Sequence, residues 1–282
     1  MLAMAITLCE VCVEDLKGAK NSLQVGANRV EYCDDLANAG TTPNPQNIIH
    51  LAKWIEAEKP GKALRIMIRN RPGNFTYTSE EIQDMAQTIK DLETHLKDLK
   101  LDYGYVIGAL KTGDDGENTV DHEAVKSWAA QTEKPLTFHR AFDEIPNWEQ
   151  ALKDLAECGI DTILTTGKTA GQVDEGRGYS TEGLQKLQAA ANPLGITILA
   201  SGGMRPETYH EGLAEGGITQ VHLRAPKTTE AKGNSSEMGS SADLVNDVDP
   251  GNSAGQRNSA EAESSTDPEL VKAMLKTLKL GE

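Results

Sequence analysis

Short apolar runs of high β-propensity alternate with longer amphipathic runs from the start of the chain to about residue 224. This alternation constrains the fold more than any other feature, because it is typical of a parallel sheet whose strands are joined by helices. We predict strands at 6–11, 29–32, 64–68, 103–108, 136–138, 162–164, 196–199 and 220–223. We predict helices at 13–25, 45–57, 79–99, 121–131, 148–158, 181–190 and 206–215.

Eight strands match the count of a closed (β/α)8 barrel of the TIM type. An open doubly wound sheet is the competing architecture, and it would usually carry a Gly-x-Gly-x-x-Gly turn after its first strand. This chain has Cys12-Val13-Glu14-Asp15 at that place, so we favour the barrel. Among the helix signals, Ser79 before two glutamates predicts an N-cap, and Pro206 predicts a helix start.

The composition changes after residue 225. Serine, glycine, asparagine, aspartate and glutamate dominate 226–267, and such a segment cannot bury enough apolar surface to offset its ordering entropy. We therefore predict one α/β domain in three parts. Residues 1–225 supply the eight strands and seven helices, 226–267 form a long, mostly disordered insertion, and 268–282 form the closing helix of the barrel.

Charge and hydropathy exclude several classes of protein. A net charge of −15 and a pI near 4.9 leave no basic stripe for nucleic-acid phosphates. No apolar run approaches the roughly 20 residues that span a bilayer. Four cysteines are too few for a disulfide scaffold, and the first residues lack the basic region of a secretory signal, so we expect a cytoplasmic protein.

Charged and thiol side chains gather where the predicted strands end. The clearest case is Thr137-Phe138-His139-Arg140-Ala141-Phe142-Asp143, in which an apolar strand runs into an imidazole, a guanidinium and a carboxylate. Residues two apart on a strand share a face. The pairs that share a face at other strand ends are Glu10 with Cys12, Glu31 with Cys33, and Arg69 with Arg71. In a parallel barrel these ends meet at the face where such folds carry their chemistry.

These side chains suggest two kinds of role. We predict proton-transfer roles for four of them, namely Glu10, Glu31, His139 and Asp143. We predict that six residues bind a small anion, namely Arg69, Arg71, Arg140, Ser201, Gly202 and His222. Ser201 and Gly202 are included because small residues before a helix let backbone amides approach an anion. A salt-bridge network that only fixes the strand register, with Glu10 or Glu31 paired to Arg69 or Arg140, is the alternative.

With these residues assembled, the chain resembles the CutC copper-homeostasis family. The resemblance rests on seven segments: Glu10–Cys12, Arg29–Cys33, Gly40–Pro43, Arg69–Phe75, Phe138–Asp143, Leu164–Gly167 and Val221-His222. It implies a (β/α)8 barrel, a cytoplasmic protein with a part in copper tolerance, and a homodimer or higher homo-oligomer. Cu(I) prefers thiolate and thioether ligands. Cys12 and Cys33 lie on neighbouring strands and share a face, so they are the predicted metal ligands, with His139 as a third candidate.

Two functions from different classes follow. The first is a copper-homeostasis protein that binds or buffers Cu(I) through Cys12 and Cys33. The second is a barrel enzyme that acts on a small carboxylate or phosphate metabolite with the arginine, histidine and glutamate cluster. The excess of arginine and carboxylate over soft ligands favours the second, and the pair of thiols favours the first. A purely structural barrel is the third alternative.

Overall fold

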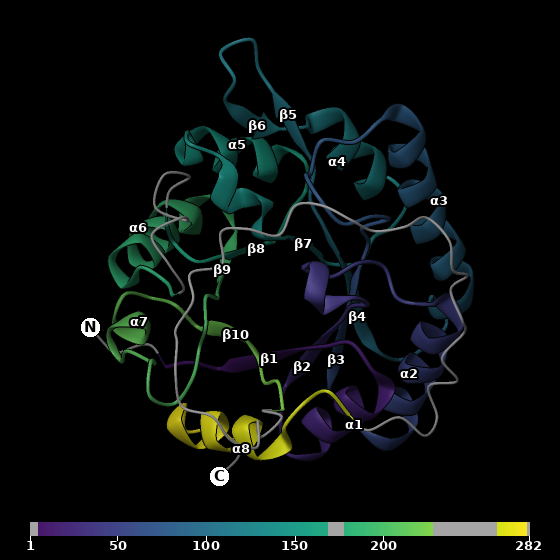
Figure 1. The fold of residues 1–282 in the computed structure, drawn as a ribbon, viewed down its shortest axis with the longest axis vertical. Helices are drawn as coiled ribbons and strands as arrows, with labels where there is room; N and C mark the ends of the chain where they lie inside the picture. Colours follow the sequence, from purple (N-terminus) through teal and green to yellow (C-terminus); the bar gives the residue numbers. More distant parts are fainter. Residues whose placement is uncertain (1–4, 169–177, 228–263, 281–282) are drawn as a thin grey trace, which may run out of the picture.

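The computed structural model describes residues 5–168, 178–227 and 264–280. Within these ranges eight parallel strands close a barrel in the order β1-β10-β9-β8-β7-β4-β3-β2, and helices surround it (Figure 1). The barrel strands are β1 (Leu8–Val13), β2 (Arg29–Tyr32), β3 (Ala63–Met67), β4 (Asp102–Ile107), β7 (Leu136–Phe138), β8 (Thr162–Thr165), β9 (Thr197–Ala200) and β10 (Gln220–Arg224). The predicted (β/α)8 barrel is confirmed, and every predicted strand bound agrees to within two residues.

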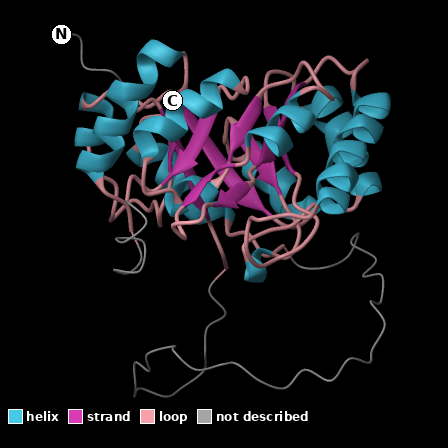
Figure 2. Cartoon of the chain, turned by 90° about the horizontal axis from the view of Figure 1, so that it is seen from above, coloured by secondary structure: helices cyan, strands magenta, loops and turns pink. Residues whose placement is uncertain are grey.

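The helices lie outside the strands, as Figure 2 shows. They are α1 (Leu16–Gln24), α2 (Pro45–Glu58), α3 (Ser79–Leu96), α4 (His122–Ala129), α5 (Trp148–Glu157), α6 (Thr181–Ala191), α7 (Gly212–Glu215) and α8 (Pro268–Thr277). Short 3-10 turns occur at η1 (Leu36–Asn38), η2 (Arg140–Glu144) and η4 (Asn192–Leu194). No helix among the described residues is both long and apolar enough to cross a membrane.

Two helix starts differ from prediction. The N-cap of α3 is Thr78 and not Ser79, because Thr78 and Glu81 bond to each other's backbone amides and form a capping box. The helix predicted at 206–215 is reduced to α7, one turn long. The Tyr179 hydroxyl donates to the carbonyl of Thr208 and accepts from the amide of His210, so two backbone groups that a helix would use are already bonded.

An antiparallel hairpin in the connection between β4 and α4 was not predicted. It consists of β5 (Leu110–Thr112) and β6 (Asn118–Val120), and it projects beyond the ring of helices (Figure 1). Its strands are only three residues long, which is too short for a clear alternation of apolar and polar residues.

The buried apolar side chains form two clusters. The larger lies between strands and helices and contains outward-facing strand residues such as Val11 and Val13. The smaller contains Cys12, Cys33, Met67 and Val106, which alternate with those outward-facing residues and so lie inside the barrel. Cys9 and Cys158 belong to the larger cluster, in agreement with the packing roles expected for them.

The predicted insertion at 226–267 falls mainly on 228–263, which lies outside the described residues. Its two ends are ordered, contrary to the predicted bounds. Pro226 and Thr266 form an antiparallel bridge, and the amide of Lys227 donates to the carbonyl of Ser265 at 2.9 Å. These bonds bring the chain back beside β10 directly before α8, which packs next to α1 (Figure 1).

Candidate functional site

A cavity of about 390 Å³ opens among the C-terminal ends of the barrel strands. Its wall combines thiols, carboxylates, cations and apolar side chains. The lining residues are Cys12, Glu31, Cys33, Leu36, Ala39, Met67, Arg69, Phe75, His139, Arg140, Asp143, Glu144, Leu164, His222 and Arg224. The strand ends that were expected to meet therefore do meet around one space.

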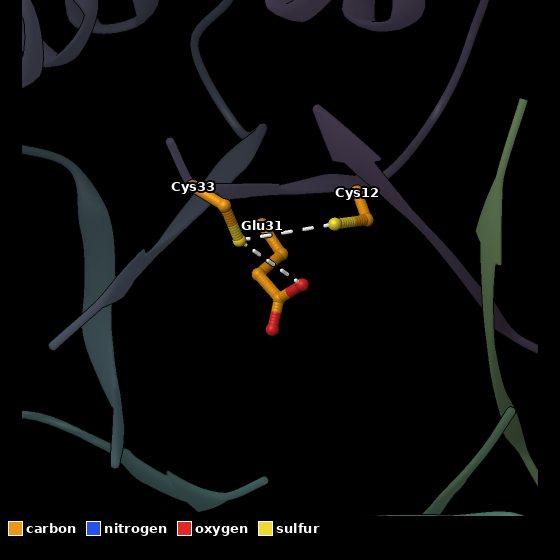
Figure 3. Close-up of side chains that lie close together, drawn as sticks. All are labelled: Cys12, Glu31 and Cys33. Atoms are coloured by element: carbon orange, nitrogen blue, oxygen red, sulfur yellow. Dashed lines mark hydrogen bonds between the residues drawn. The ribbon is translucent and has the colours of Figure 1, made fainter. Parts of the chain in front are cut away.

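Two thiols from neighbouring strands face each other in this cavity. The sulfurs of Cys12 and Cys33 are 3.8 Å apart although the residues are separated by 21 positions, and both side chains are buried (Figure 3). Strand register brings them together, because Cys12 pairs with Glu31 and the amide of Cys33 donates to the carbonyl of Val13. Gly40, with φ of +86°, packs beside the Cys33 side chain, and a Cβ at this position would lie 3.4 Å from the Cys33 sulfur.

Both thiols are protonated near neutral pH. The bond between the two thiols and burial raise the pKa of Cys12 well above its usual value. For Cys33, the bond to Cys12 opposes the shift, but burial and the neighbouring Glu31 raise its pKa to about 12. A metal ion that binds these sulfurs must therefore displace their protons.

Glu31 lies beneath the two thiols. Its Oε2 accepts from the Cys33 thiol at 3.5 Å and lies 3.8 Å from Nε2 of His222, while its buried Oε1 has no partner among the described residues. Burial raises the pKa of Glu31, although the charge of His222 opposes the shift. Glu31 belongs to two groups of side chains whose ligand atoms lie within 4.8 Å of one another: Cys12, Glu31 and Cys33, and Glu10, Glu31 and His222.

Glu10 is held in a buried ion-pair network below Glu31. It contacts the Nε of Arg29 and accepts from Nδ1 of His222 at 2.7 Å. Burial opposes its ionisation, but Arg29 and His222 lower the pKa of Glu10 to about 2. Burial lowers the pKa of His222, but the carboxylates of Glu31 and Glu10 outweigh this effect and raise its pKa well above the usual value. In the alternative of a purely structural network, Glu10 was paired with Arg69 or Arg140, but its observed partner is Arg29.

His139 lies on the opposite wall, directly after β7. Its ring is buried, its Nδ1 accepts from the amide of Ala141 at 3.2 Å, and its Nε2 has no partner among the described residues. Burial and the charge of Arg69 lower the pKa of His139 to about 3, so the ring is neutral. Because Nδ1 accepts a hydrogen bond, the proton of the neutral ring is on Nε2.

Arg69 and Asp143 hold the loops around the cavity. The buried Arg69 donates to the carbonyls of Asn38, Gly40 and Gly73, which belong to two different loops. Asp143 accepts from Nε of Arg140 at 3.0 Å. It also accepts from the hydroxyl groups of Thr165 and Thr166 and from the Thr166 amide. Both oxygens of Asp143 are thus fully used by the scaffold.

Three predicted binding residues are not in the cavity wall. Arg71 pairs with Glu81 at the start of α3 and stacks over Tyr77 at 4.9 Å. Ser201 is buried after β9 without a partner for its hydroxyl, and Gly202 follows it in the loop. Because α7 begins only at Gly212, the amides around Gly202 do not form a helix N-terminus for an anion.

Some wall residues carry no clear signal in the sequence. Phe75 lies against His139, with ring centroids 4.7 Å apart, and Met67 packs beside the thiols. Met67 could have been found from strand alternation, because it shares a face with Arg69. Leu36 and Glu144 lie in loops or turns, where no periodicity indicates the direction of a side chain.

The fold and this cavity together define a (β/α)8-barrel protein whose polar cavity lies at the C-terminal ends of the strands. The chain belongs to the CutC family, whose model matches residues 7–227. It is 32% identical over 223 residues to a family protein CutC of Aliivibrio fischeri, covering 79% of this chain and 83% of the relative. It is 30% identical over 241 residues to the human copper homeostasis protein cutC homolog, covering 83% and 80%.

A solved structure also supports membership of the CutC family. The crystal structure of the copper homeostasis protein CutC from Streptococcus agalactiae aligns with a TM-score of 0.65 at 30% identity. The alignment covers 77% of this chain and 98% of that one. The resemblance inferred from the sequence motifs is therefore confirmed.

Proposed function

We propose that this protein binds Cu(I) between Cys12 and Cys33 and serves copper homeostasis in the cytosol by buffering or transferring the ion. The observation that supports this function is the pair of buried sulfurs 3.8 Å apart at the cavity wall. The name of the human relative, a copper homeostasis protein, points to the same metal.

The donor set suits a soft cation. Cu(I) prefers thiolate and thioether sulfur to oxygen. Metal–thiolate bonds are about 2.3 Å long, so two sulfurs on opposite sides of one ion are at most about 4.6 Å apart. The observed separation lies within this limit, so one ion can contact both sulfurs. Met67 belongs to the same buried cluster as both cysteines and offers a third soft atom. The His139 ring, which was the third candidate, lies among Phe75, Phe138 and Arg69.

The experiment is an anaerobic Cu(I) titration against a competing chelator. We expect about one tightly bound ion per chain in the wild type, lost in Cys12→Ser/Cys33→Ser and weakened in Met67→Leu. Cys158→Ala is the matched control, since Cys158 packs on the outside of the barrel and should leave binding unchanged. Binding that is weak, or that survives in the double variant, contradicts the proposal.

Acid–base catalysis on an anionic metabolite is the second function considered, and three of its four predicted residues receive less support, whereas Glu31 keeps a raised pKa and an unpartnered Oε1. Asp143 and Glu10 are saturated by hydrogen bonds and ion pairs. His139 carries its proton on Nε2 and has a low pKa, so it is a hydrogen-bond donor rather than a base. We therefore place metal binding first and assign no reaction.

Two further properties belong to this proposal. All four cysteines are free, which suits the reducing cytosol in which Cu(I) is handled. We also propose a homodimer or higher homo-oligomer, as the family resemblance implies. Light scattering coupled to size-exclusion chromatography tests the oligomer, and fractionation with an antibody to the full chain tests the location. A monomer, or a protein found outside the cytosol, would contradict each in turn.

A further inference from the structure

One wall of the cavity presents the guanidinium groups of Arg69 and Arg140 and the Nε2 donor of His139, which has no acceptor among the described residues. We propose that Arg69, His139 and Arg140 form a binding site for the carboxylate of a small organic acid. This site faces the thiols across the cavity and goes beyond metal binding, because it uses none of the sulfur atoms proposed to bind the metal.

Arg69 is a buried cation that makes no direct ion pair with a described residue, although the more distant Glu144 carboxylate senses its charge. Its side chain is 2% exposed, and its hydrogen bonds go to backbone carbonyls. Five other arginines contact a carboxylate, namely Arg29, Arg65, Arg71, Arg140 and Arg224. Among the described residues, no carboxylate lies within ion-pair distance of Arg69. A buried charge is costly unless it is paired, so a bound anion would supply the missing partner.

His139 adds a second donor. Its ring lines the cavity, it is 4% exposed, and its protonated Nε2 has no acceptor among the described residues. An unpaired buried donor costs free energy that a ligand acceptor recovers. Phe75 stacks on both groups, with its ring 4.7 Å from the His139 ring and 5.0 Å from the Arg69 guanidinium carbon. The two donors therefore contact the same aromatic side chain.

Arg140 completes the wall at the cavity mouth. It binds Asp143 through Nε, and its side chain is 49% exposed. The rest of its guanidinium is therefore available to solvent or to a ligand at the entrance. An oxyanion attracted by Arg140 would move inward to the fixed charge of Arg69, which is where desolvation strengthens the interaction.

Several features favour a carboxylate over a phosphate. The donors are side chains, and α7 begins too late to place backbone amides around a phosphate. The single charge of Arg69, which has no direct ion-pair partner among the described residues, matches a monoanionic group. Met67, Phe75 and Leu164 supply apolar surface for a short carbon chain, and about 390 Å³ accommodates a small acid. Glu31 does not compete for this wall, because it lies on β2 and accepts from the thiol of Cys33 on the other side of the cavity.

The test measures binding of butyrate, succinate and inorganic phosphate to the metal-free full-length chain by calorimetry in a buffer without carboxylates. We expect at least one of the two acids to bind, with affinity reduced about 10- to 100-fold in Arg69→Met and about tenfold in His139→Phe. Arg71→Met is the matched control, because its guanidinium turns to Glu81 and away from the cavity, and it should change the affinity by less than about twofold.

Three outcomes would overturn the proposal. One is no binding of either acid at about 10 mM. Another is equal affinity in wild type, Arg69→Met and His139→Phe. The third is phosphate binding more tightly than both acids. If Arg69→Met does not fold, His139→Phe still decides the question, since it keeps the ring volume and removes the donor. Because no metal is present, these results do not depend on whether the thiols bind copper.

Discussion

The His139 ring occupies the space that a side chain at position 108 would need. A Cβ built on Gly108 would lie 2.3 Å from Cε1 and 2.4 Å from Nδ1 of that ring. Gly108 follows β4 and His139 follows β7, and these strands are neighbours in the barrel. The amide of His139 also donates to the carbonyl of Ile107 at 2.8 Å. Because Gly108 has no side chain, the space beside it is free for the imidazole of His139.

We expect Gly108→Ala to displace the His139 ring and to lower the free energy of unfolding by about 1–3 kcal/mol, the usual cost of overpacking a core. Urea denaturation measures this loss. The carboxylate affinity proposed above should fall in the same variant, because the Nε2 donor moves.

A double variant separates this contact from a general effect of alanine. In the His139→Ala background the added methyl group has room, so Gly108→Ala should cost at least about 1 kcal/mol less than in the wild type. Equal costs in both backgrounds would show that the ring does not determine the requirement for glycine.

The low pKa of His139 makes stability depend on pH. The folded chain keeps the ring neutral down to a pKa of about 3, whereas in the unfolded chain the ring takes up a proton at its ordinary pKa of 6.5. The contribution of the neutral His139 ring to the free energy of unfolding is therefore complete above about pH 6.5, and it is lost as the pH falls towards 3. Between about pH 7 and pH 5 the wild type should lose about 2 kcal/mol that His139→Phe does not lose.

Urea denaturation at several pH values checks this difference. His95→Gln is the matched control, since His95 is an exposed histidine on α3. Parallel pH profiles for the wild type and His139→Phe would contradict the buried, neutral state of the ring.

Asp143 should matter for stability more than for chemistry. Asp143→Asn keeps the shape but directs an NH2 group at donors that now bond a carboxylate, so we expect a loss of about 2–4 kcal/mol. Asp114→Asn, at the exposed tip of the β5–β6 hairpin, is the control. Thermal and urea denaturation give the comparison. A loss below about 0.5 kcal/mol for Asp143→Asn would mean that its contacts with Arg140, Thr165 and Thr166 contribute little.

The barrel was predictable because its signals are local. Each strand is a short apolar run and each helix has its own pattern, so counting them identifies the closed sheet. The alternation of inward and outward residues also placed Cys12 and Cys33 on one face. The end of the chain that returns at Thr266 was missed, because its order comes from contacts with Asp15 and Gly18, some 250 residues earlier in the sequence.

Pairing within the site was less predictable for the same reason. The partner of Glu10 is Arg29 at the start of β2, and only strand register shows that these two residues are opposite each other. Arg69 and Arg71 share a predicted face, but the chain leaves the strand at Met67, so alternation no longer holds for Arg71. Sequence pattern thus identified strand-end residues but did not determine which of them line the cavity.

Copper binding, if it uses the thiols, should release protons. The pKa values of Cys12 and Cys33 are both raised, so both sulfurs are protonated in the metal-free protein. Binding of Cu(I) to two thiolates then releases about two protons, and the apparent affinity should rise up to about 100-fold for each pH unit below those pKa values. Titrations in buffers of different ionisation enthalpy count the protons. A pH-independent affinity would contradict thiolate ligation.

The hydrogen bonds of Asp15 should contribute more to the stability of the chain than residues 228–263 do. One oxygen of Asp15 caps α1 by accepting from the amide of Gly18, and the other accepts from the amide and hydroxyl of Ser265 at 2.9 and 2.8 Å. Asp15→Ala removes all three bonds and should cost about 2–3 kcal/mol in urea denaturation. Replacing 228–263 by a short glycine-rich turn keeps them, because Lys227 and Ser265 are already paired, and should change the stability by less than about 1 kcal/mol. A larger loss on that replacement, with Asp15 intact, would show that the replaced segment itself stabilises the barrel.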